Sequence, residues 1–308
     1  MAVTLQEIAR ALGGEVHGNQ VLAPGPGHSR KDRSLSVRLS DTTPDGFIVH
    51  SHAGDDWRAC RDHVADALNL PRNRWRDQRE PDLEQVERRQ QARRQADARE
   101  QAETARLQRR AGAMWSAAVD PRGSVVATYL RSRGLELTDD VAGAVLRYHP
   151  ACPWGDGVAP AMVAAIRNYT TGRITGIHRT ALTAEGAKIG RKVFGTAAGG
   201  AIMLDPAETV SAELTAGEGI ETCLSARQLG LRPVWSLIST SNISVLLPIP
   251  GVQRLTLLAE NDTNPKRPSF RACGQARTRW QAADRTVDLL WPPLNCKDLN
   301  DALMEAAR

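Results

Sequence analysis

Four strand-and-helix pairs in the last hundred residues place the strongest constraint on the fold of this chain. Apolar runs predict strands at residues 210–216, 233–238, 254–259 and 286–290. Helical segments are expected to follow them at residues 220–229, 243–247, 269–283 and 299–307. Repeated strand–helix units form a parallel sheet with right-handed crossovers. The C-terminal third is therefore predicted to be an α/β domain built on a parallel sheet.

Acidic residues gather just after these strands: Glu218, Glu260, Asp262 and Asp298. The carboxyl ends of parallel strands meet at one edge of a sheet, and ligands bind outside that edge. Carboxylates brought together repel each other unless a cation lies between them. Oxygen-only ligands suit Mg²⁺ or Mn²⁺. We therefore predict that the four carboxylates hold a divalent metal ion, and that Glu218, Glu260 and Asp262 are catalytic in phosphoryl or nucleotidyl transfer.

Each of these residues also has a purely structural interpretation. Glu218 is either a metal ligand, a general base or a carboxylate that caps the next helix, where the helix dipole favours negative charge. Glu221 lies in the first turn of that helix and is equally consistent with capping and with supporting the metal site. Asp262 is alternatively a loop residue. Asp298 directly precedes a helix and is also a good N-cap.

Composition and length exclude several classes of protein. The chain has 308 residues, of which 41% are hydrophobic, so about two domains with real cores are expected. No apolar stretch approaches the roughly 20 residues needed to span a bilayer, and the N-terminus lacks the pattern of a secretory signal. We therefore expect a cytoplasmic protein with no membrane association. The five cysteines are scattered without a CxxC pair, which argues against a disulfide framework and a standard zinc knuckle.

The net charge of +5 is unevenly distributed. Residues 72–110 contain 12 Arg and 8 Asp or Glu, a net of +4. Residues 82–112 predict one long exposed helix, which is either a solvated spacer or an arm that contacts nucleic acid. Downstream, strands are expected at residues 162–168 and 174–183, after a helix at 125–133. Basic residues in and after these strands are candidates to bind nucleotide or template phosphates, or are solvated loop charges: Arg179, Lys188, Arg191 and Lys192.

The first seventy residues predict a small separate unit. A helix begins after Thr4 and ends at Gly13, because Thr4 and Glu7 form the pattern of a capping box. A Gly- and Pro-rich loop at residues 23–28 follows. Residues 34–39 and 46–50 predict a β-hairpin, and a helix over residues 56–68 closes the unit.

Three C-terminal segments together resemble a known catalytic domain. Residues 218–222 (Glu-Gly-Ile-Glu-Thr), 259–262 (Ala-Glu-Asn-Asp) and 297–301 (Lys-Asp-Leu-Asn-Asp) resemble the Toprim domain in order, spacing and strand context. This fold is shared by bacterial-type DNA primases, type IA and type II topoisomerases, and some nucleases. The segments are most similar to the Toprim domain of phage and plasmid primases.

The resemblance implies an architecture for the whole chain. Residues 1–76 resemble a degenerate primase zinc-binding, zinc-ribbon-like domain, and residues 77–118 would be a charged helical linker. Residues 119–205 resemble the α+β subdomain that precedes Toprim in the primase core, and residues 206–308 the Toprim catalytic domain. Mg²⁺ or Mn²⁺ would be the cofactor. The implied partners are single-stranded DNA, nucleoside triphosphates and a replicative helicase.

The sequence departs from the family in two places. Zinc-binding cysteines are expected near Ala23 and at residues 51–54, where Ser, His, Ala and Gly stand instead. A zinc ion is therefore not expected, although one alternative ligand set is His28, His50, His52, Cys60 and His63. Glu260 replaces the first Asp of the family's Asp-x-Asp pair. Its extra methylene moves the carboxylate by about 1 Å, a displacement that can cost on the order of 100-fold in rate.

The resemblance implies a DNA primase-like nucleotidyltransferase that makes short primers by two-metal catalysis. Two alternatives remain open: a metal-dependent Toprim nuclease, and a replication accessory protein that binds DNA but has lost catalysis. No Walker A pattern is present, and no tyrosine lies in a context that suits a topoisomerase.

Overall fold

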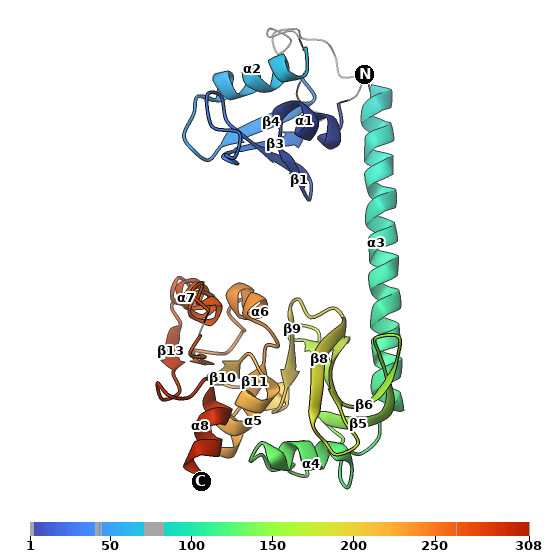
Figure 1. Ribbon diagram of the computed structural model, residues 1–308, viewed down its shortest axis with the longest axis vertical. Coiled ribbons are helices and arrows are strands. Elements are labelled where there is room, and N and C mark those ends of the chain that lie inside the picture. The colour runs from blue at the N-terminus through green and yellow to red at the C-terminus, as the bar shows by residue number, and fades with distance from the viewer. Residues whose placement is uncertain (1–2, 41–42, 44, 71–82, 263, 308) are drawn as a thin grey trace. The chain divides into compact units, whose positions relative to one another are not determined.

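The chain forms two compact units, residues 1–99 and 100–308. The computed structural model describes residues 3–40, 43, 45–70, 83–262 and 264–307 (Figure 1). The expected domain boundary between residues 76 and 77 lies outside these ranges. Across the described residues, no helix combines the length and the apolar character that crossing a bilayer requires.

The N-terminal unit is a four-stranded antiparallel sheet, in the order β1-β2-β3-β4, packed against two helices. Helix α1 begins with the predicted capping box of Thr4 and Glu7 and ends at Gly13, whose φ of 64° favours glycine. The predicted hairpin is confirmed as β3 and β4. The short strands β1 and β2 were not predicted, and β2 includes Ala23, which was assigned to a loop. The elements are α1 (Leu5–Leu12), β1 (Glu15–His17), β2 (Gln20–Ala23), β3 (Leu35–Leu39), β4 (Phe47–Ser51) and α2 (Trp57–Ala67).

The long predicted helix is present as α3 (Leu83–Ala117), and it continues five residues beyond the expected end at residue 112. The extension follows from packing, because Ala111 and Trp115 are buried against the sheet that comes next in the chain. Gly112 is tolerated inside the helix at a modest cost in stability, roughly 1 kcal/mol relative to Ala.

An antiparallel sheet follows α4 (Val125–Ser132). The two predicted strands are confirmed as β6 and β7, which pair with each other. Three further strands, β5, β8 and β9, were not predicted. Strand β8 is mostly exposed and rich in basic residues and glycine, so its sequence lacks the apolar alternation of a typical strand. The strands are β5 (Leu146–Trp154), β6 (Gly157–Asn168), β7 (Ile174–Leu182), β8 (Lys188–Gly195) and β9 (Gly200–Met203).

The C-terminal part is the predicted α/β domain. Its strands pair in parallel in the order β13-β12-β10-β11. Strand β10 starts at Glu213 instead of residue 210, because residues 207–209 form a 3₁₀ turn. The elements are β10 (Glu213–Gly217), α5 (Ile220–Gln228), β11 (Val234–Ser236), α6 (Thr240–Val245), β12 (Arg254–Leu258), α7 (Pro268–Gln281), β13 (Thr286–Leu290) and α8 (Leu299–Ala306).

Strand β9 joins the two sheets into one. It pairs antiparallel with β6 on one side and with β11 on the other. Helices α6 and α7 cover one face of the parallel strands, and α5 and α8 lie on the other (Figure 1). A parallel sheet covered on both faces leaves its strand ends as the place where ligands reach the domain.

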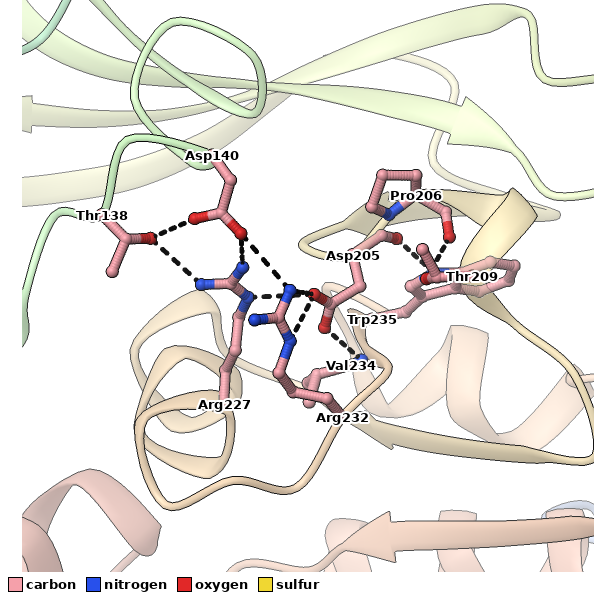
Figure 2. A network of polar contacts seen from close by, with 9 residues as sticks. All are labelled: Thr138, Asp140, Asp205, Pro206, Thr209, Arg227, Arg232, Val234 and Trp235. Atoms are coloured by element: carbon pink, nitrogen blue, oxygen red, sulfur yellow. Dashed lines mark hydrogen bonds and ion pairs between the residues drawn. The ribbon is translucent and has the colours of Figure 1, made fainter.

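A partly buried network of charged side chains connects the two halves of this unit (Figure 2). Asp205 is 1% exposed and accepts hydrogen bonds from the guanidinium groups of Arg227 and Arg232. Both arginines also reach Asp140, which precedes β5. The indole N–H of Trp235 donates to the carbonyl oxygen of Asp205 at 3.0 Å. The network therefore links the segment before β5, the connection after β9 and the parallel sheet.

An acidic edge beside paired cations

Glu218 is held at the carboxyl end of β10 by glycine on either side. A Cβ atom on Gly217 would lie 3.0 Å from the Cys223 sulfur and from Leu258, so no larger residue fits without movement. The N-cap of α5 is Gly219, and no side chain makes a capping hydrogen bond there. The interpretation of Glu218 as a capping carboxylate is therefore wrong, and its side chain is left free to interact at the strand edge.

Asp262 follows β12 and caps the next helix. Its Oδ2 accepts hydrogen bonds from the backbone N–H groups of Ser269, at 2.8 Å, and Phe270, at 3.4 Å, at the start of α7. The Ser269 hydroxyl in turn accepts the N–H of Glu260 at 3.1 Å. The loop that carries Glu260 and Asp262 is thus fixed to a helix N-terminus, where carboxylates are stabilised.

Asp298 also caps a helix, as its position before α8 predicted. Its Oδ1 accepts the N–H groups of Asn300 and Asp301 at 2.9 and 3.0 Å. The N–H of Asn261 donates to the carbonyl oxygen of Lys297 at 2.8 Å, which joins this loop to the one after β12. The two capping carboxylates therefore stand on neighbouring loops at one edge of the sheet.

Burial, together with like charges, raises the pKa values of two carboxyl groups at this edge. The pKa of Glu260 is raised to about 7, mainly by burial and then by the charges of Glu218 and Asp298. Burial likewise raises the pKa of Glu218, with Asp262 adding to the shift and the cations Arg191 and Lys297 opposing it. Each of the four predicted carboxylates thus interacts with at least one other, through the pairs Glu260–Glu218, Glu260–Asp298 and Glu218–Asp262. A cation would relieve this repulsion.

The four carboxylates at this edge are candidate ligands for a divalent metal ion. Four carboxylates without nitrogen or sulfur suit Mg²⁺ or Mn²⁺ in chemistry. In the part of the chain that the structure describes, however, no three His, Cys, Asp or Glu side chains already form a group that could hold a metal. The chemistry of the four side chains therefore fits Mg²⁺ or Mn²⁺.

The alternative zinc ligands of the N-terminal unit are not assembled either. The described residues, which include all five of that set, contain no such group. His28 instead lies between two carboxylates, with Nδ1 3.0 Å from Asp32 and Nε2 3.1 Å from Asp55. Cys60 is fully buried in the apolar core. This part of the fold is held by hydrogen bonds and packing.

Two of the predicted basic residues face the acidic edge. A guanidinium nitrogen of Arg191 lies 3.7 Å from Glu218, and the Lys188 ammonium lies 2.8 Å from Glu221. Glu221 also accepts a hydrogen bond from the hydroxyl of Tyr129 on α4. Burial opposes ionisation, but the charge and hydrogen bond of Lys188, together with Tyr129, lower the pKa of Glu221 to about 2. Glu221 therefore links β8, α4 and α5 as a permanent anion.

A β-bulge decides which cations reach this edge. Thr180 of β7 pairs with Arg191, but Leu182 pairs with Lys188, so β8 has one extra residue between them. The bulge places Lys188 and Arg191 on the same face although they are three apart. The other two predicted residues, Arg179 and Lys192, pair with each other and lie on the opposite face. The structure does not bring that pair to the acidic edge.

One contributor to this site was not predicted from the sequence. Tyr129 was assigned only to a helix, and nothing local indicates its contact with a residue 92 positions away. His178 is 6% exposed on β7, and burial lowers its pKa to about 4 even though Glu221 opposes the shift. The ring is therefore neutral at pH 7 and adds no positive charge to this edge.

Comparison with known proteins identifies the C-terminal domain. Residues 213–308 match the Toprim domain family, and residues 105–204 match a domain of unknown function, DUF7146. The chain therefore contains a Toprim domain, as the three acidic segments predicted. No curated protein matches the chain.

Solved structures similar to the chain include three primases. A DNA primase domain from Pseudomonas aeruginosa is 15% identical, covers 65% of this chain and 74% of its own, and gives a TM-score of 0.46. The Aquifex aeolicus primase, with its zinc-binding and RNA polymerase domains, is 12% identical over 98% of this chain and 84% of its own, at 0.46. The primase fragment of the bacteriophage T7 primase-helicase is 14% identical over 58% and 64%, at 0.37.

Proposed function

We propose that this protein is a primase-like nucleotidyltransferase that synthesises short primers on single-stranded DNA. The observation that carries the proposal is the coincidence of a Toprim domain with an edge where the pKa of Glu260 is raised by burial and by Glu218 and Asp298, and that of Glu218 by burial and by Asp262. Single-stranded DNA and nucleoside triphosphates would be its substrates, a replicative helicase its partner, and the cytoplasm its location.

The acidic edge would hold two Mg²⁺ or Mn²⁺ ions through Glu218, Glu260, Asp262 and Asp298. When bound, such ions lower the pKa of an attacking 3′-hydroxyl and neutralise charge on the pyrophosphate leaving group. Asp262 and Asp298 are pre-oriented, because helix amides fix one oxygen of each. Glu218 makes no capping bond, and its raised pKa suits it to accept the proton of the attacking hydroxyl.

The cations at this edge would bind the triphosphate. Arg191 contacts Glu218 at 3.7 Å, which is longer than a hydrogen bond, so it can turn toward a phosphate when one arrives. Lys188 is held by Glu221 and presents a positive charge at a fixed place. Both residues already lie beside the glutamates of this edge, so no other segment has to move to supply a cation.

A primer-synthesis assay tests the proposal. The full chain is incubated with single-stranded DNA and labelled nucleoside triphosphates while Mg²⁺ and Mn²⁺ are varied. Metal-dependent oligonucleotide synthesis is expected in the wild type, with a loss on the order of 100-fold or more in Asp262→Ala and Glu218→Gln. Glu213→Gln is the matched control, because Glu213 is an exposed carboxylate at the other end of β10. No synthesis in the wild type under any metal would overturn the proposal.

One observation favours a second candidate, a DNA-binding accessory protein without catalysis. Within the described ranges the carboxylates are not yet grouped as a metal site, and Glu260 replaces the shorter Asp. In that case Glu260→Asp would create no activity, and DNA binding would persist in a chelator. Cleavage of DNA without nucleotide incorporation would instead indicate the Toprim nuclease.

A further inference from the structure

The face of β7 and β8 that points away from the acidic edge carries an alternating series of cations and aromatic rings. The series runs Arg110, Phe194, Arg179, Trp154 and Lys192, and we call it the cation–aromatic ladder. Arg110 lies 5.2 Å from the Phe194 ring centre, and Arg179 lies 5.4 Å from that ring and 5.9 Å from Trp154. The Lys192 ammonium lies 4.9 Å from the Trp154 ring.

The ladder is built by four different elements. Arg110 comes from α3, Trp154 from β5, and Arg179 and Lys192 from paired positions of β7 and β8. Gly190 of β8 lies against Trp154, because a Cβ atom there would be 3.2 Å from the indole ring. The missing side chain of Gly190 therefore leaves room for the Trp154 ring to lie against the strand. The ring is only partly buried.

The cations of the ladder have no carboxylate partners. Among the described residues, no Asp or Glu lies within ion-pair distance of Arg110, Arg179 or Lys192. Arg179 is only 7% exposed, donates to the carbonyl oxygen of Pro153, and leaves its Nε without a hydrogen-bond partner. A nearly buried guanidinium without a counter-charge is costly. On the other face of the same strand, Lys188 and Arg191 are both neutralised by glutamates.

We propose that the cation–aromatic ladder is a binding tract for single-stranded nucleic acid, separate from the acidic edge. The exposed ends, Arg110 and Lys192, would contact phosphates, and Trp154 would offer its ring to an unpaired base. Interleaved cations and aromatic rings are the arrangement that binds single strands without sequence preference. A duplex hides its base faces and would gain only the phosphate contacts. The identification of the strand as a template rests on the proposed function, whereas the binding itself does not.

The tract is tested by the affinity of the full chain for a fluorescent oligothymidylate of about 20 nucleotides, which exceeds the site size of most single-strand-binding folds. The measurement is made in a chelator, so that the acidic edge takes no part. The double variant Arg110→Ala/Lys192→Ala is expected to bind about tenfold more weakly. Its plot of log affinity against log salt should be shallower by about 1.4, since each lost phosphate contact removes roughly 0.7 on a single strand.

A charge-matched control separates the tract from general electrostatic attraction. Arg131→Ala/Arg277→Ala removes two exposed cations from α4 and α7 and leaves the ladder intact. Trp154→Leu keeps the cations and removes the ring, so it should weaken binding about fivefold or more with an unchanged salt slope. Equal losses in the two double variants would overturn the proposal, as would unchanged affinity in the ladder variant or no binding by the wild type. Melting temperatures near that of the wild type show that each variant is folded.

The result can be told apart from that of the primer-synthesis assay. A chain that binds through the ladder but makes no primers contradicts the proposed function alone. A chain that makes primers and whose ladder variant binds like the wild type contradicts the tract alone.

Discussion

Two carboxylate clusters in residues 100–308 differ in what surrounds them. Asp205, near the amino end of β11, lies between the guanidinium groups of Arg227 and Arg232. Glu260, at the carboxyl end of β12, lies near the carboxylates of Glu218 and Asp298. In the first cluster opposite charges neutralise one another inside the protein. In the second, like charges meet at an open edge.

The first cluster stabilises the fold, whereas the second destabilises it and is kept in place by the rest of the structure. Breaking a buried ion pair leaves an uncompensated charge and is strongly destabilising. Bringing like charges together makes an unfavourable contribution to the free energy of folding. A bound cation removes this contribution. The contrast can be measured, and four changes test it in order of decreasing effect.

Removing the buried carboxylate should have the largest effect. Asp205→Ala leaves Arg227, which is nearly buried, without its buried counter-charge and is expected to lower the free energy of unfolding by about 3–5 kcal/mol. Chemical denaturation measures the change. Asp288→Ala is the control, because its ion pair with Arg254 is exposed on both sides and should cost less than about 1 kcal/mol. A loss in Asp205→Ala no larger than in that control would show that the network does not hold the fold.

The effect of removing Glu221 should be intermediate, because this residue lies at the acidic edge but forms an ion pair with Lys188. Glu221→Gln removes the counter-charge of Lys188 and should lower the free energy of unfolding by about 2 kcal/mol at pH 7. The folded pKa, about 2, is below the ordinary value of 4.5, so this contribution is present above pH 4.5 and disappears as the pH falls toward 2. Urea denaturation from pH 7 down to pH 3 should show the wild type and the variant converging. Parallel curves would contradict the assignment.

Glu260 should behave in the opposite way. Its folded pKa, about 7, is above 4.5, so ionisation destabilises the fold progressively as the pH rises from 4.5 to 7. Glu260→Gln is therefore expected to be more stable than the wild type at pH 8, on the order of 1 kcal/mol after allowance for solvent screening, and equal to it at pH 4. Thermal unfolding at the two pH values is sufficient. A destabilised variant at pH 8 would show that Glu260 is not under charge repulsion.

A divalent cation should produce the smallest shift. Mg²⁺ that binds only the folded chain, at about twice its dissociation constant, should stabilise the wild type by about 0.6 kcal/mol. Glu218→Gln and Glu260→Gln should lose this gain, while Glu213→Gln should keep it. The melting temperature with and without Mg²⁺ measures it. Equal gains in all four proteins would place the cation elsewhere.

Local patterns in the sequence were sufficient for much of the fold. Apolar runs followed by helical segments predicted the parallel sheet, and the position of Asp298 before a helix predicted its capping role, which is confirmed. The three acidic segments predicted the Toprim domain, which the family comparison bears out. These features depend on residues close together in the chain, so each could be predicted from its own neighbourhood.

Other features depend on contacts between distant segments. No pattern near Tyr129 indicates Glu221, and none near Asp140 indicates Arg227. The exposed strand β8 lacks apolar alternation, and its bulge, which sends Lys188 to one face and Lys192 to the other, is visible only once its pairing with β7 is known.

The sequence by itself determined the parallel α/β domain, the edge at which its acidic residues lie, and the capping position of Asp298, because strand direction and helix starts follow from local chemistry. The tertiary structure alone decided which charges are neutralised. It pairs Asp205 with two arginines, leaves Glu260 among carboxylates, and places no described carboxylate beside the ladder cations. The physical reason is that charge compensation depends on distance in space, and a chain of this length brings residues tens of positions apart within a few ångströms.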